Sequence, residues 1–280
     1  MKTLLVPTDF SPNAVHAMKY AIRLSQRLNT RIVFFHSTYV ALSVDQYGAS
    51  EKKVKSTEKK NVEEKEADLL ALIKKLYSQL RIDIDESKTT VVVKPGTLIV
   101  EDIVAAAEKC KADMIVMGTH GASGIARLFG NNTSILIAKS FIPVLAVPPN
   151  YRYRALKQIL YASDLKNPLN ELKRLLPLAA AFGASIDVFN LSYTAGEDEA
   201  RLFKKLTGET EYKALRFVQL KRDPGESVLH QLQEFLQYRK PDLTVMFHEK
   251  KGFFESIFGS SNTEKLSYSL ITPLLAFRKK

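Results

Sequence analysis

Short apolar runs alternate along the chain with longer stretches that place apolar residues at helical spacing. Runs such as residues 4–7, 32–35 and 114–117 are continuously apolar, which is typical of strands buried on both faces of a parallel sheet. The stretches between them have the period of amphipathic helices that would cover such a sheet. The pattern therefore predicts an α/β fold whose parallel strands are joined by right-handed helical crossovers.

The same order of elements occurs twice. Residues 2–39 and residues 157–193 each contain a short strand that ends at an acidic residue, Asp9 or Asp164, and then a helix and a second strand. Each half continues with a third strand, a Pro/Gly turn, a helix and a buried strand, and closes with a short helix and a final strand. A repeat on this scale predicts two copies of one domain.

Prolines indicate where the domains and their first helices begin. Two consecutive prolines at 148 and 149 interrupt the pattern, so we expect two tandem doubly wound parallel-sheet domains of about five strands each, at residues 1–150 and 151–280. Ser11-Pro12 and Asn167-Pro168 should start the first helix of each domain. In both pairs a side-chain oxygen can cap a free helix amide, and proline fits the first helical turn.

Composition points to a globular protein of a reducing compartment. The chain has 280 residues and 45% apolar content, enough for a core in each half. No apolar run approaches the roughly 20 residues that span a bilayer, and the N-terminal apolar stretch is too short for a signal peptide. Cys110 is the only cysteine, which excludes a disulfide within one chain. We expect a cytoplasmic protein with no membrane partner.

The net charge of +11 raises the question of nucleic-acid binding, which requires clustered Lys and Arg. The excess is spread evenly, with 20 Lys and Arg against 15 Asp and Glu in residues 1–150, and 21 against 15 in the remainder. The densest stretch, residues 51–76, mixes both signs in the manner of a solvated helix face. The distribution makes nucleic acid an unlikely partner.

Ligands of open α/β sheets bind beyond the carboxyl ends of the strands, where the strand order reverses. In the first half this directs attention to Asp9, Ser37 and the segment after Met117. The Asp9 carboxylate could meet a ribose hydroxyl or a base amine, or it could only cap the turn before Ser11. Its recurrence as Asp164 fits both interpretations.

The segment from residue 118 to residue 134 is rich in glycine. Gly118 and Gly121 let the backbone approach a ligand without a Cβ atom in the way, and Gly130 comes just before a helix. The amides of that helix start, at residues 131–133, would face outward with the positive end of the helix dipole behind them. Phosphate is the ligand that this arrangement favours.

These residues resemble the universal stress protein family in its tandem two-domain form. The resemblance rests on LLVPTDFS (4–11), ADMIVMGTHGASG (112–124), LFGNNTS (128–134) and PVLAVP (143–148), and it covers both halves of the chain. It implies a parallel five-stranded fold and pairing through the last strands. In one subset of the family it also implies ATP bound by Gly-x-x-Gly, nine residues, then Gly-Ser/Thr.

The resemblance assigns roles by position. It implies that Asp9 meets the adenosine, that backbone groups around Ser37 line the base pocket, and that the segment from Met117 onward forms the ribose and phosphate path. His120 either contacts phosphate or bonds a nearby carbonyl. The nucleotide-binding residues expected on this basis are Asp9, Ser37, Met117, Gly118, His120, Gly121, Gly130, Asn131, Asn132 and Thr133.

The phosphate end of the first half departs from the family pattern in two ways. Eight residues, one fewer than the pattern, separate Gly121 from Gly130, and Asn131 stands where Ser or Thr is expected. Thr133 could supply a hydroxyl one turn later, and neighbouring Asn side chains can donate to phosphate oxygens.

The second half departs more strongly. Met246 and Glu249 are aligned with Gly118 and Gly121, so side chains occupy the ligand path and a negative charge lies where phosphate would bind. On the same alignment His248 matches His120. We expect no ordinary ATP site in this half.

Three hypotheses follow for function. The first is a cytosolic stress-response regulatory module that binds ATP, AMP or another adenine nucleotide in the first half, with or without Mg²⁺. No nucleophile elbow, Gly-Lys-Ser/Thr loop or His-Glu-x-x-His motif is present, so we expect at most slow ATP hydrolysis. The alternative is a non-nucleotide-binding interaction or scaffold protein of the same fold whose site has lapsed, and the third, nucleic-acid binding, rests on charge alone.

The expected partners follow from the same resemblance. The two halves should pair within one chain as a pseudo-dimer, through VLAV (144–147) and LLAF (274–277). A protein partner is expected but not identified, and a homodimer of two chains remains open.

Overall fold

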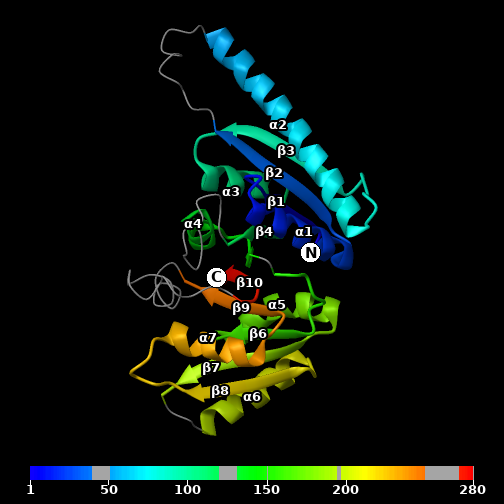
Figure 1. The fold of residues 1–280 in the computed structure, drawn as a ribbon. Helices are drawn as coiled ribbons and strands as arrows, with labels where there is room; N and C mark the ends of the chain where they lie inside the picture. The colour runs from blue at the N-terminus through cyan, green and yellow to red at the C-terminus, as the bar shows by residue number, and fades with distance from the viewer. Residues whose placement is uncertain (40–50, 120–130, 150, 194–196, 250–270, 280) are drawn as a thin grey trace.

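The structure, a computed structural model, describes residues 1–39, 51–119, 131–149, 151–193, 197–249 and 271–279. Within these residues ten strands form one sheet with helices on both faces, and the two halves of the chain occupy opposite ends of the molecule (Figure 1). The α/β architecture predicted from the apolar pattern is therefore confirmed.

The elements follow the predicted order in both halves. The first half contains β1 (Thr3–Pro7), α1 (Pro12–Leu28), β2 (Arg31–Tyr39), α2 (Glu51–Leu80), β3 (Thr89–Gly96), α3 (Ile99–Lys109), β4 (Met114–Gly118), α4 (Asn131–Lys139) and β5 (Val144–Val147). The second half contains β6 (Gln158–Ala162), α5 (Pro168–Phe182), β7 (Ser185–Ser192), α6 (Glu197–Thr210), β8 (Leu215–Lys221), α7 (Val228–Arg239), β9 (Leu243–His248) and β10 (Leu274–Arg278). The expected domain boundary after residue 150 falls between β5 and β6 and stays a prediction.

The strand order shows that the two halves are copies of one doubly wound unit. The sheet runs β3-β2-β1-β4-β5-β10-β9-β6-β7-β8, so each half has the same order read outward from the centre. Neighbouring strands are parallel within each half, and only the central β5–β10 pair is antiparallel. An antiparallel seam between two parallel sheets relates the halves as the subunits of a dimer would be related.

The seam joins the two strands expected to pair, residues 144–147 and 274–277. Leu145 pairs with Leu275 and Ala146 with Leu274, and all four side chains are at most 2% exposed. Because the ladder is unbroken, no sheet edge is exposed between the halves. The predicted pseudo-dimer is confirmed.

Two apolar layers cover the sheet, one on each face. Alternating strand residues point to opposite faces, so that Leu4 and Val6 belong to the layer that includes residues of α1, α2, α5 and α6, whereas Leu5 belongs to the layer that includes residues of α3, α4 and α7. Each layer contains side chains from both halves of the chain. The two repeats therefore share their cores across the seam.

The first helix of each half begins where proline predicts, but the two caps differ. The Ser11 side chain accepts a hydrogen bond from the Ala14 amide, as expected for a helix cap. Asn167 precedes Pro168 in the corresponding position and makes no side-chain cap hydrogen bond. The predicted Asn167 cap is wrong, because the Asn167 backbone (φ −142°, ψ 48°) lacks the extended conformation that Ser11 adopts at its cap.

Gly118 allows α1 to lie directly against the end of β4. A Cβ atom at Gly118 would come within 2.9 Å of the Asn13 carbonyl oxygen and 3.1 Å of its carbon. Real Cβ atoms almost never approach so closely, and the obstacle is backbone that has little room to shift. Glycine is thus required here for packing, whether or not a ligand binds.

The strand pairing corrects the alignment of the second half by one residue. Leu4 pairs with Met114 and its counterpart Ile159 pairs with Leu243, so that Phe247, and not Met246, corresponds to Gly118. In the same register His248 corresponds to Thr119, and not to His120. A phenylalanine therefore stands where the first half requires glycine.

The Phe247 ring changes how the first helix of the second half packs. Phe247 stacks on Phe277 with ring centroids 4.7 Å apart, and the Arg174 guanidinium of α5 lies 4.9 Å from the Phe277 centroid. Among the described residues, α5 does not approach β9 as closely as α1 approaches β4. The aromatic pair therefore keeps α5 away from the end of the sheet.

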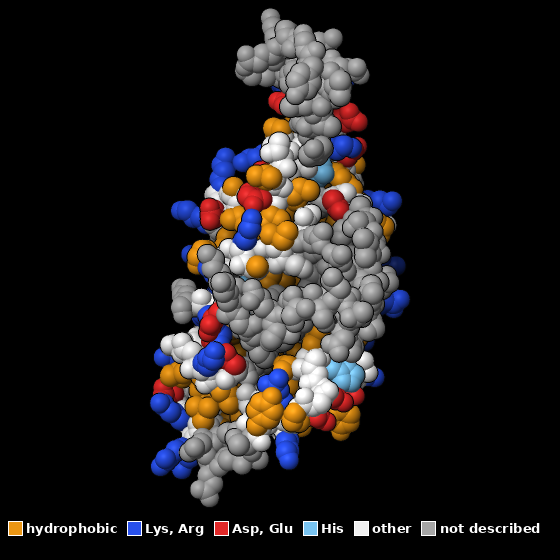
Figure 2. Space-filling model, turned by 90° about the vertical axis from the view of Figure 1, so that its left-hand side faces the viewer, with side chains coloured by type: hydrophobic (Ala, Val, Ile, Leu, Met, Phe, Trp, Pro, Cys, Tyr) orange, Lys and Arg blue, Asp and Glu red, His pale blue; other side chains and the backbone are white. Residues whose placement is uncertain are grey.

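The helices and the surface charge of the described residues match two features of the sequence, the lack of long apolar runs and the even spread of charge. Among the described residues no helix is long and apolar enough to cross a membrane. On the face shown in Figure 2, Lys and Arg side chains are interspersed with Asp and Glu over both halves. This arrangement matches the even charge distribution read from the sequence.

Asp187 anchors the outer strands of the second half. It is fully buried in β7, where its carboxylate accepts hydrogen bonds from Arg239 (2.6 Å), Arg216 (2.8 Å) and Gln158 (2.8 Å). Burial disfavours the charged carboxylate, but the hydrogen bonds from Arg239, Gln158 and Arg216 outweigh it and lower the pKa of Asp187 below its usual value. One side chain thus connects β6, β7, β8 and α7.

Asp187→Asn should lower the free energy of unfolding at pH 7 by about 2 kcal/mol, because it leaves two guanidinium groups without their anion. Since the folded pKa of Asp187 lies below the unfolded value, its stabilising effect is complete above about pH 4 and is lost as the pH falls through the folded pKa. Urea denaturation between pH 7 and pH 3 should show the difference from wild type narrowing as pH falls. Asp83→Asn, on an exposed carboxylate, is the control. A loss that stays constant with pH would contradict this role.

Gly118→Ala should destabilise the protein by about 1–3 kcal/mol, because the added methyl group would collide with the Asn13 backbone. Gly208→Ala in α6 is the matched control. Nothing lies within 4 Å of a Cβ atom there, so this change should stabilise by about 0.5–1 kcal/mol. Chemical denaturation of both variants checks the pair. Equal stability of Gly118→Ala and wild type would show that α1 can move away from β4.

Candidate functional site

In the first half the strand order reverses between β1 and β4, and sheets of this kind have their ligand crevice at such a reversal. These strands are neighbours, but α1 leaves β1 on one face of the sheet and α4 packs on the other face. The two connections therefore diverge at the carboxyl edge, which is where ligands of such sheets bind. Asp9 follows β1 and Gly118 ends β4, so both lie at this point.

Asp9 stabilises the turn that leads into α1. Its Oδ1 atom accepts a hydrogen bond from the Ser11 amide at 3.0 Å, and the residue is exposed. Phe10 has a left-handed backbone (φ 62°), and its amide donates to the Thr8 hydroxyl oxygen at 3.1 Å. The turn-capping interpretation of Asp9 is confirmed, and contact with adenosine stays a prediction.

The second half repeats this turn with a different use of its carboxylate. Asp164 accepts from the Lys166 amide at 3.1 Å, Leu165 has φ 59°, and the Leu165 amide donates to Ser163. Asp164 also binds the Lys279 ammonium group at 2.7 Å, in a place where both side chains are less than one-fifth exposed. The backbone is conserved between repeats, while the second carboxylate is engaged by the chain's own lysine.

The other predicted residues of the base and ribose region have structural partners. The Ser37 hydroxyl on β2 donates to Asp102 of α3 at 2.8 Å, which leaves backbone groups for the lining role expected there. Met117 is 9% exposed and packs with the apolar layer that contains Leu136 of α4. Asp102 was not predicted, because its pairing with Ser37 joins residues 65 positions apart.

The start of α4 lies beside Gly118. Thr133 is 2% exposed, and its hydroxyl donates to the Gly118 carbonyl oxygen at 3.0 Å. Asn132 is exposed on the same turn, and Asn131 begins the helix. The Thr133 hydroxyl hydrogen is thus committed to β4, and within the part of the chain that the structure describes the groups offered to an anion here are backbone amides and the Asn132 side chain.

Three predicted site residues lie outside the described residues: His120, Gly121 and Gly130. The structure brings Asp9, Ser37, Met117, Gly118, Asn132 and Thr133 to the same end of the first half.

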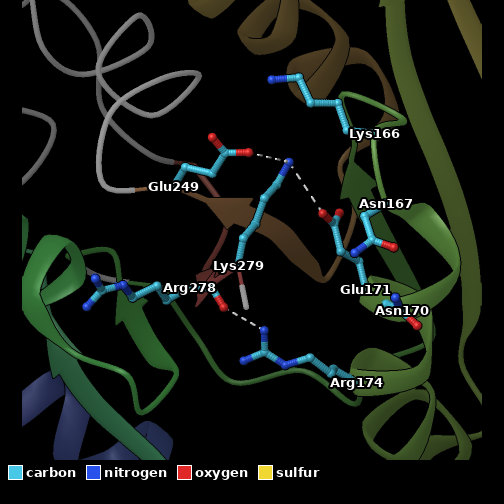
Figure 3. A pocket seen from close by; sticks show the side chains of 8 residues that line it. All are labelled: Lys166, Asn167, Asn170, Glu171, Arg174, Glu249, Arg278 and Lys279. Atoms are coloured by element: carbon cyan, nitrogen blue, oxygen red, sulfur yellow. Dashed lines mark hydrogen bonds and ion pairs between the residues drawn. The ribbon is translucent and has the colours of Figure 1, made fainter.

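In the second half a polar pocket of about 590 Å³ lies where α5 stands away from β9 (Figure 3). Lys279 is its central residue and makes ion pairs with Asp164, with Glu171 (3.4 Å) and with Glu249 (3.9 Å). Arg174 donates to the Arg278 carbonyl oxygen at 2.6 Å. The pocket is therefore crossed by internal contacts that tie the end of β10 to α5 and to β9.

The charged groups of this pocket shift one another's pKa values. Burial raises the pKa of Glu171, whose carboxylate also accepts a hydrogen bond from the buried Tyr161 hydroxyl. Burial alone would lower the pKa of Lys279, but its contacts with Asp164 and Glu171 outweigh this and raise it. Lys279 therefore stays charged. The sequence gives no indication of the ion pairs of Lys279 beyond the presence of a lysine directly after the last strand.

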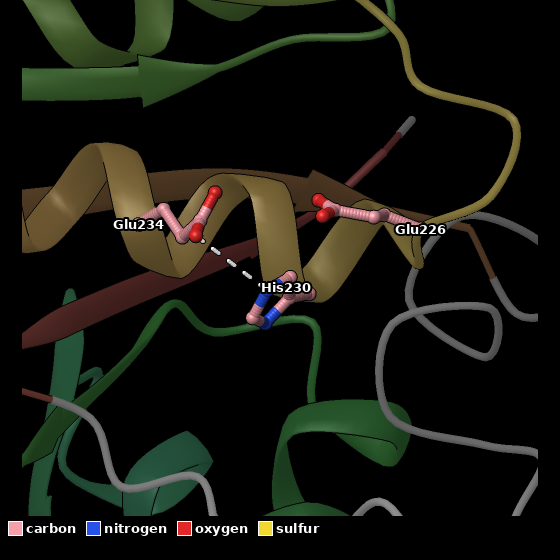
Figure 4. Close-up of side chains that lie close together, drawn as sticks. All are labelled: Glu226, His230 and Glu234. Carbon is pink, nitrogen blue, oxygen red and sulfur yellow. Dashed lines mark ion pairs between the residues drawn. The ribbon is translucent and has the colours of Figure 1, made fainter.

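One group of metal-ligating side chains occurs among the described residues, on the outer face of α7 (Figure 4). Ligand atoms of Glu226, His230 and Glu234 lie within 4.8 Å of one another, and His230 Nε2 is 3.6 Å from Glu234 Oε1. Exposed groups of this kind are common without a metal. The contact has the ordinary i,i+4 spacing of a helix surface pair.

Comparison with known proteins gives consistent results. Residues 1–148 match the family model of the universal stress protein family. A universal stress protein of Methanocaldococcus jannaschii is 29% identical over 147 residues, which are 52% of this chain and 81% of that protein. The sequence evidence is thus concentrated in the first half.

Solved structures extend the likeness to the whole chain. A universal stress protein from Archaeoglobus fulgidus has a TM-score of 0.65 at 16% identity, covering 99% of this chain and 96% of that one. A putative universal stress protein from Pseudomonas aeruginosa has a TM-score of 0.58 at 14% identity, covering 99% and 93%. At these identities the structures show a shared fold. With the repeated turn, the strand order and the family match, they establish that the chain belongs to the universal stress protein family, in its tandem two-domain form.

Proposed function

We propose that this protein is a cytosolic stress-response regulatory module that binds an adenine nucleotide, ATP or AMP, in its first repeat. The observation that carries the proposal is the placement of the exposed Asp9 carboxylate and the start of α4 at the ends of two neighbouring strands, β1 and β4, where the strand order reverses. A carboxylate can accept hydrogen bonds from ribose hydroxyls, and a helix start attracts phosphate. The Asp9 carboxylate thus suits the adenosine part of the nucleotide, and the start of α4 suits its phosphates.

Few hydrogen-bond donors for phosphate are available among the described residues of the first repeat. Because the Thr133 hydroxyl donates to Gly118, it is not available to phosphate in this arrangement. The amides at the start of α4 and the exposed Asn132 side chain are the donors that remain among the described residues. The proposal therefore relies on backbone donors and the helix dipole, with Mg²⁺ as an optional counterion.

The proposed role is binding and not rapid turnover. The chain lacks a phosphate-loop lysine, and the donors named above would hold phosphates without activating a water molecule. Occupancy of the crevice by nucleotide would then be the signal that a protein partner reads.

The second candidate is an interaction protein of the same fold whose nucleotide site has lapsed. The engaged Thr133 hydroxyl favours it, as do the shortened segment between Gly121 and Gly130 and the Asn131 substitution. This candidate predicts that adenine nucleotides leave the protein unchanged.

ATP at 1 mM should raise the melting temperature of the purified protein by about 5 °C if the dissociation constant is about 10 μM, because ligand at 100 times its dissociation constant stabilises by about 2.7 kcal/mol. Asp9→Asn should weaken ATP binding at least tenfold, since a hydrogen bond to a charged group contributes about 1.5–3 kcal/mol. Calorimetric titration of both proteins checks this.

Asp164→Asn is the matched control, because it changes the same position of the repeated turn in the second half. Its affinity for ATP should equal that of wild type. No thermal shift with ATP or AMP in wild type would favour the lapsed-site candidate, and equal weakening by Asp9→Asn and Asp164→Asn would contradict a site in the first repeat.

A further inference from the structure

The second half contains a separate hollow of about 500 Å³ at the carboxyl ends of β6 and β7, beside the start of α7. Its walls combine apolar side chains, among them Phe189, Val228 and Leu232, with polar ones such as Asn190 and Arg222. Phe189 is held in place by stacking on Phe235, with centroids 4.5 Å apart. The volume and the apolar lining are in the range of small-molecule sites.

A cation lines this hollow with one of its donors unsatisfied. Arg222 directly follows β8, and its Nε atom is buried and makes no hydrogen bond among the described residues. The carbon of its guanidinium lies 4.7 Å from the Tyr193 ring centroid, so an aromatic ring packs against the cation. A buried donor with no acceptor is costly, and an anion in the hollow would remove that cost.

The corner of the hollow that holds Arg222 is filled differently in the first half. By strand register, Arg222 corresponds to Gly96, where a Cβ atom would lie 2.0 Å from the Asp102 carboxylate and 2.1 Å from the Ser37 hydroxyl. Among the described residues the hydrogen-bonded Ser37 and Asp102 side chains occupy that corner. In the second half Leu191 replaces Ser37, and an arginine enters. The cation that lines this hollow is therefore a feature of the second repeat.

Among the lining residues of the hollow, the positive charge of Arg222 is not balanced by a free carboxylate. Asp164 also lines the hollow, but its carboxylate is neutralised by Lys279 at 2.7 Å and accepts the Lys166 amide at 3.1 Å. Ser227 caps α7 through the His230 amide, so the positive end of a 12-residue helix faces the same hollow. The net preference is for an anion.

We propose that this hollow binds a small organic anion, with a carboxylate or phosphate group on Arg222 and an apolar ring or chain against Phe189, Val228 and Leu232. Because Asp164 is held by Lys279, the ligand differs in class from the adenine nucleotide assigned to the first repeat. The two repeats would then sense two different molecules.

Calorimetric titration with 2-naphthoate, compared with neutral 2-naphthalenemethanol, tests the proposal. Wild type should bind naphthoate at least tenfold more tightly than the alcohol, since the two probes share the ring and differ in the anionic group. Arg222→Gln should remove that preference, while the ring should still bind weakly. Lys221→Gln, on the exposed neighbouring lysine, should keep the wild-type preference.

A second variant guards against a merely structural effect of the arginine change. Val228→Phe fills the hollow and leaves Arg222 in place, so it should abolish binding of both probes, and neither variant should alter the affinity for ATP. The proposal is overturned if wild type binds naphthoate no better than the alcohol, or if Arg222→Gln, folded by its melting curve, retains the preference.

Discussion

The antiparallel pairing of β5 with β10 is the constraint on which the rest of the structure depends. It converts two five-stranded parallel sheets into one ten-stranded sheet and buries Leu145 and Leu275 at its centre. Since both apolar layers extend across the seam, neither half keeps a complete core without the other. Each half also places its own strand ends and loops at its carboxyl edge. A single chain thus carries two copies of one potential site, and each copy can change without loss of the fold.

The two copies have diverged through a few substitutions of known physical effect. Gly118 lets α1 reach β4, whereas Phe247 in the same register stacks on Phe277 and keeps α5 away. Asp9 is exposed, whereas Asp164 is bound to Lys279. Gly96 is enclosed by Ser37 and Asp102, whereas Arg222 borders an open hollow. In the second repeat a large side chain thus stands in place of each glycine, and a lysine of the same chain is bound to the carboxylate that recurs.

Much of the fold could be predicted because buried parallel strands and amphipathic helices leave strong patterns in the sequence. The Ser11 cap and the repeat order follow from such local signals, whereas the seam was expected from the family resemblance. The register of the second repeat did not, because a Phe in place of Gly hides the correspondence and only strand pairing reveals it. Contacts such as Lys279 with Asp164, 115 residues apart, depend on where β10 lies and have no local signal. The same holds for Ser37 with Asp102.

The two repeats share a backbone, and we propose that they differ in the ligand that each admits. A crystal structure of the protein grown with ATP would distinguish the two sites. We expect nucleotide density in the first repeat only, with the ribose at Asp9 and the phosphates at the start of α4, while Lys279 still binds Asp164. Nucleotide density at Asp164 with Lys279 displaced, or an empty crevice at Asp9 under saturating ATP, would contradict it.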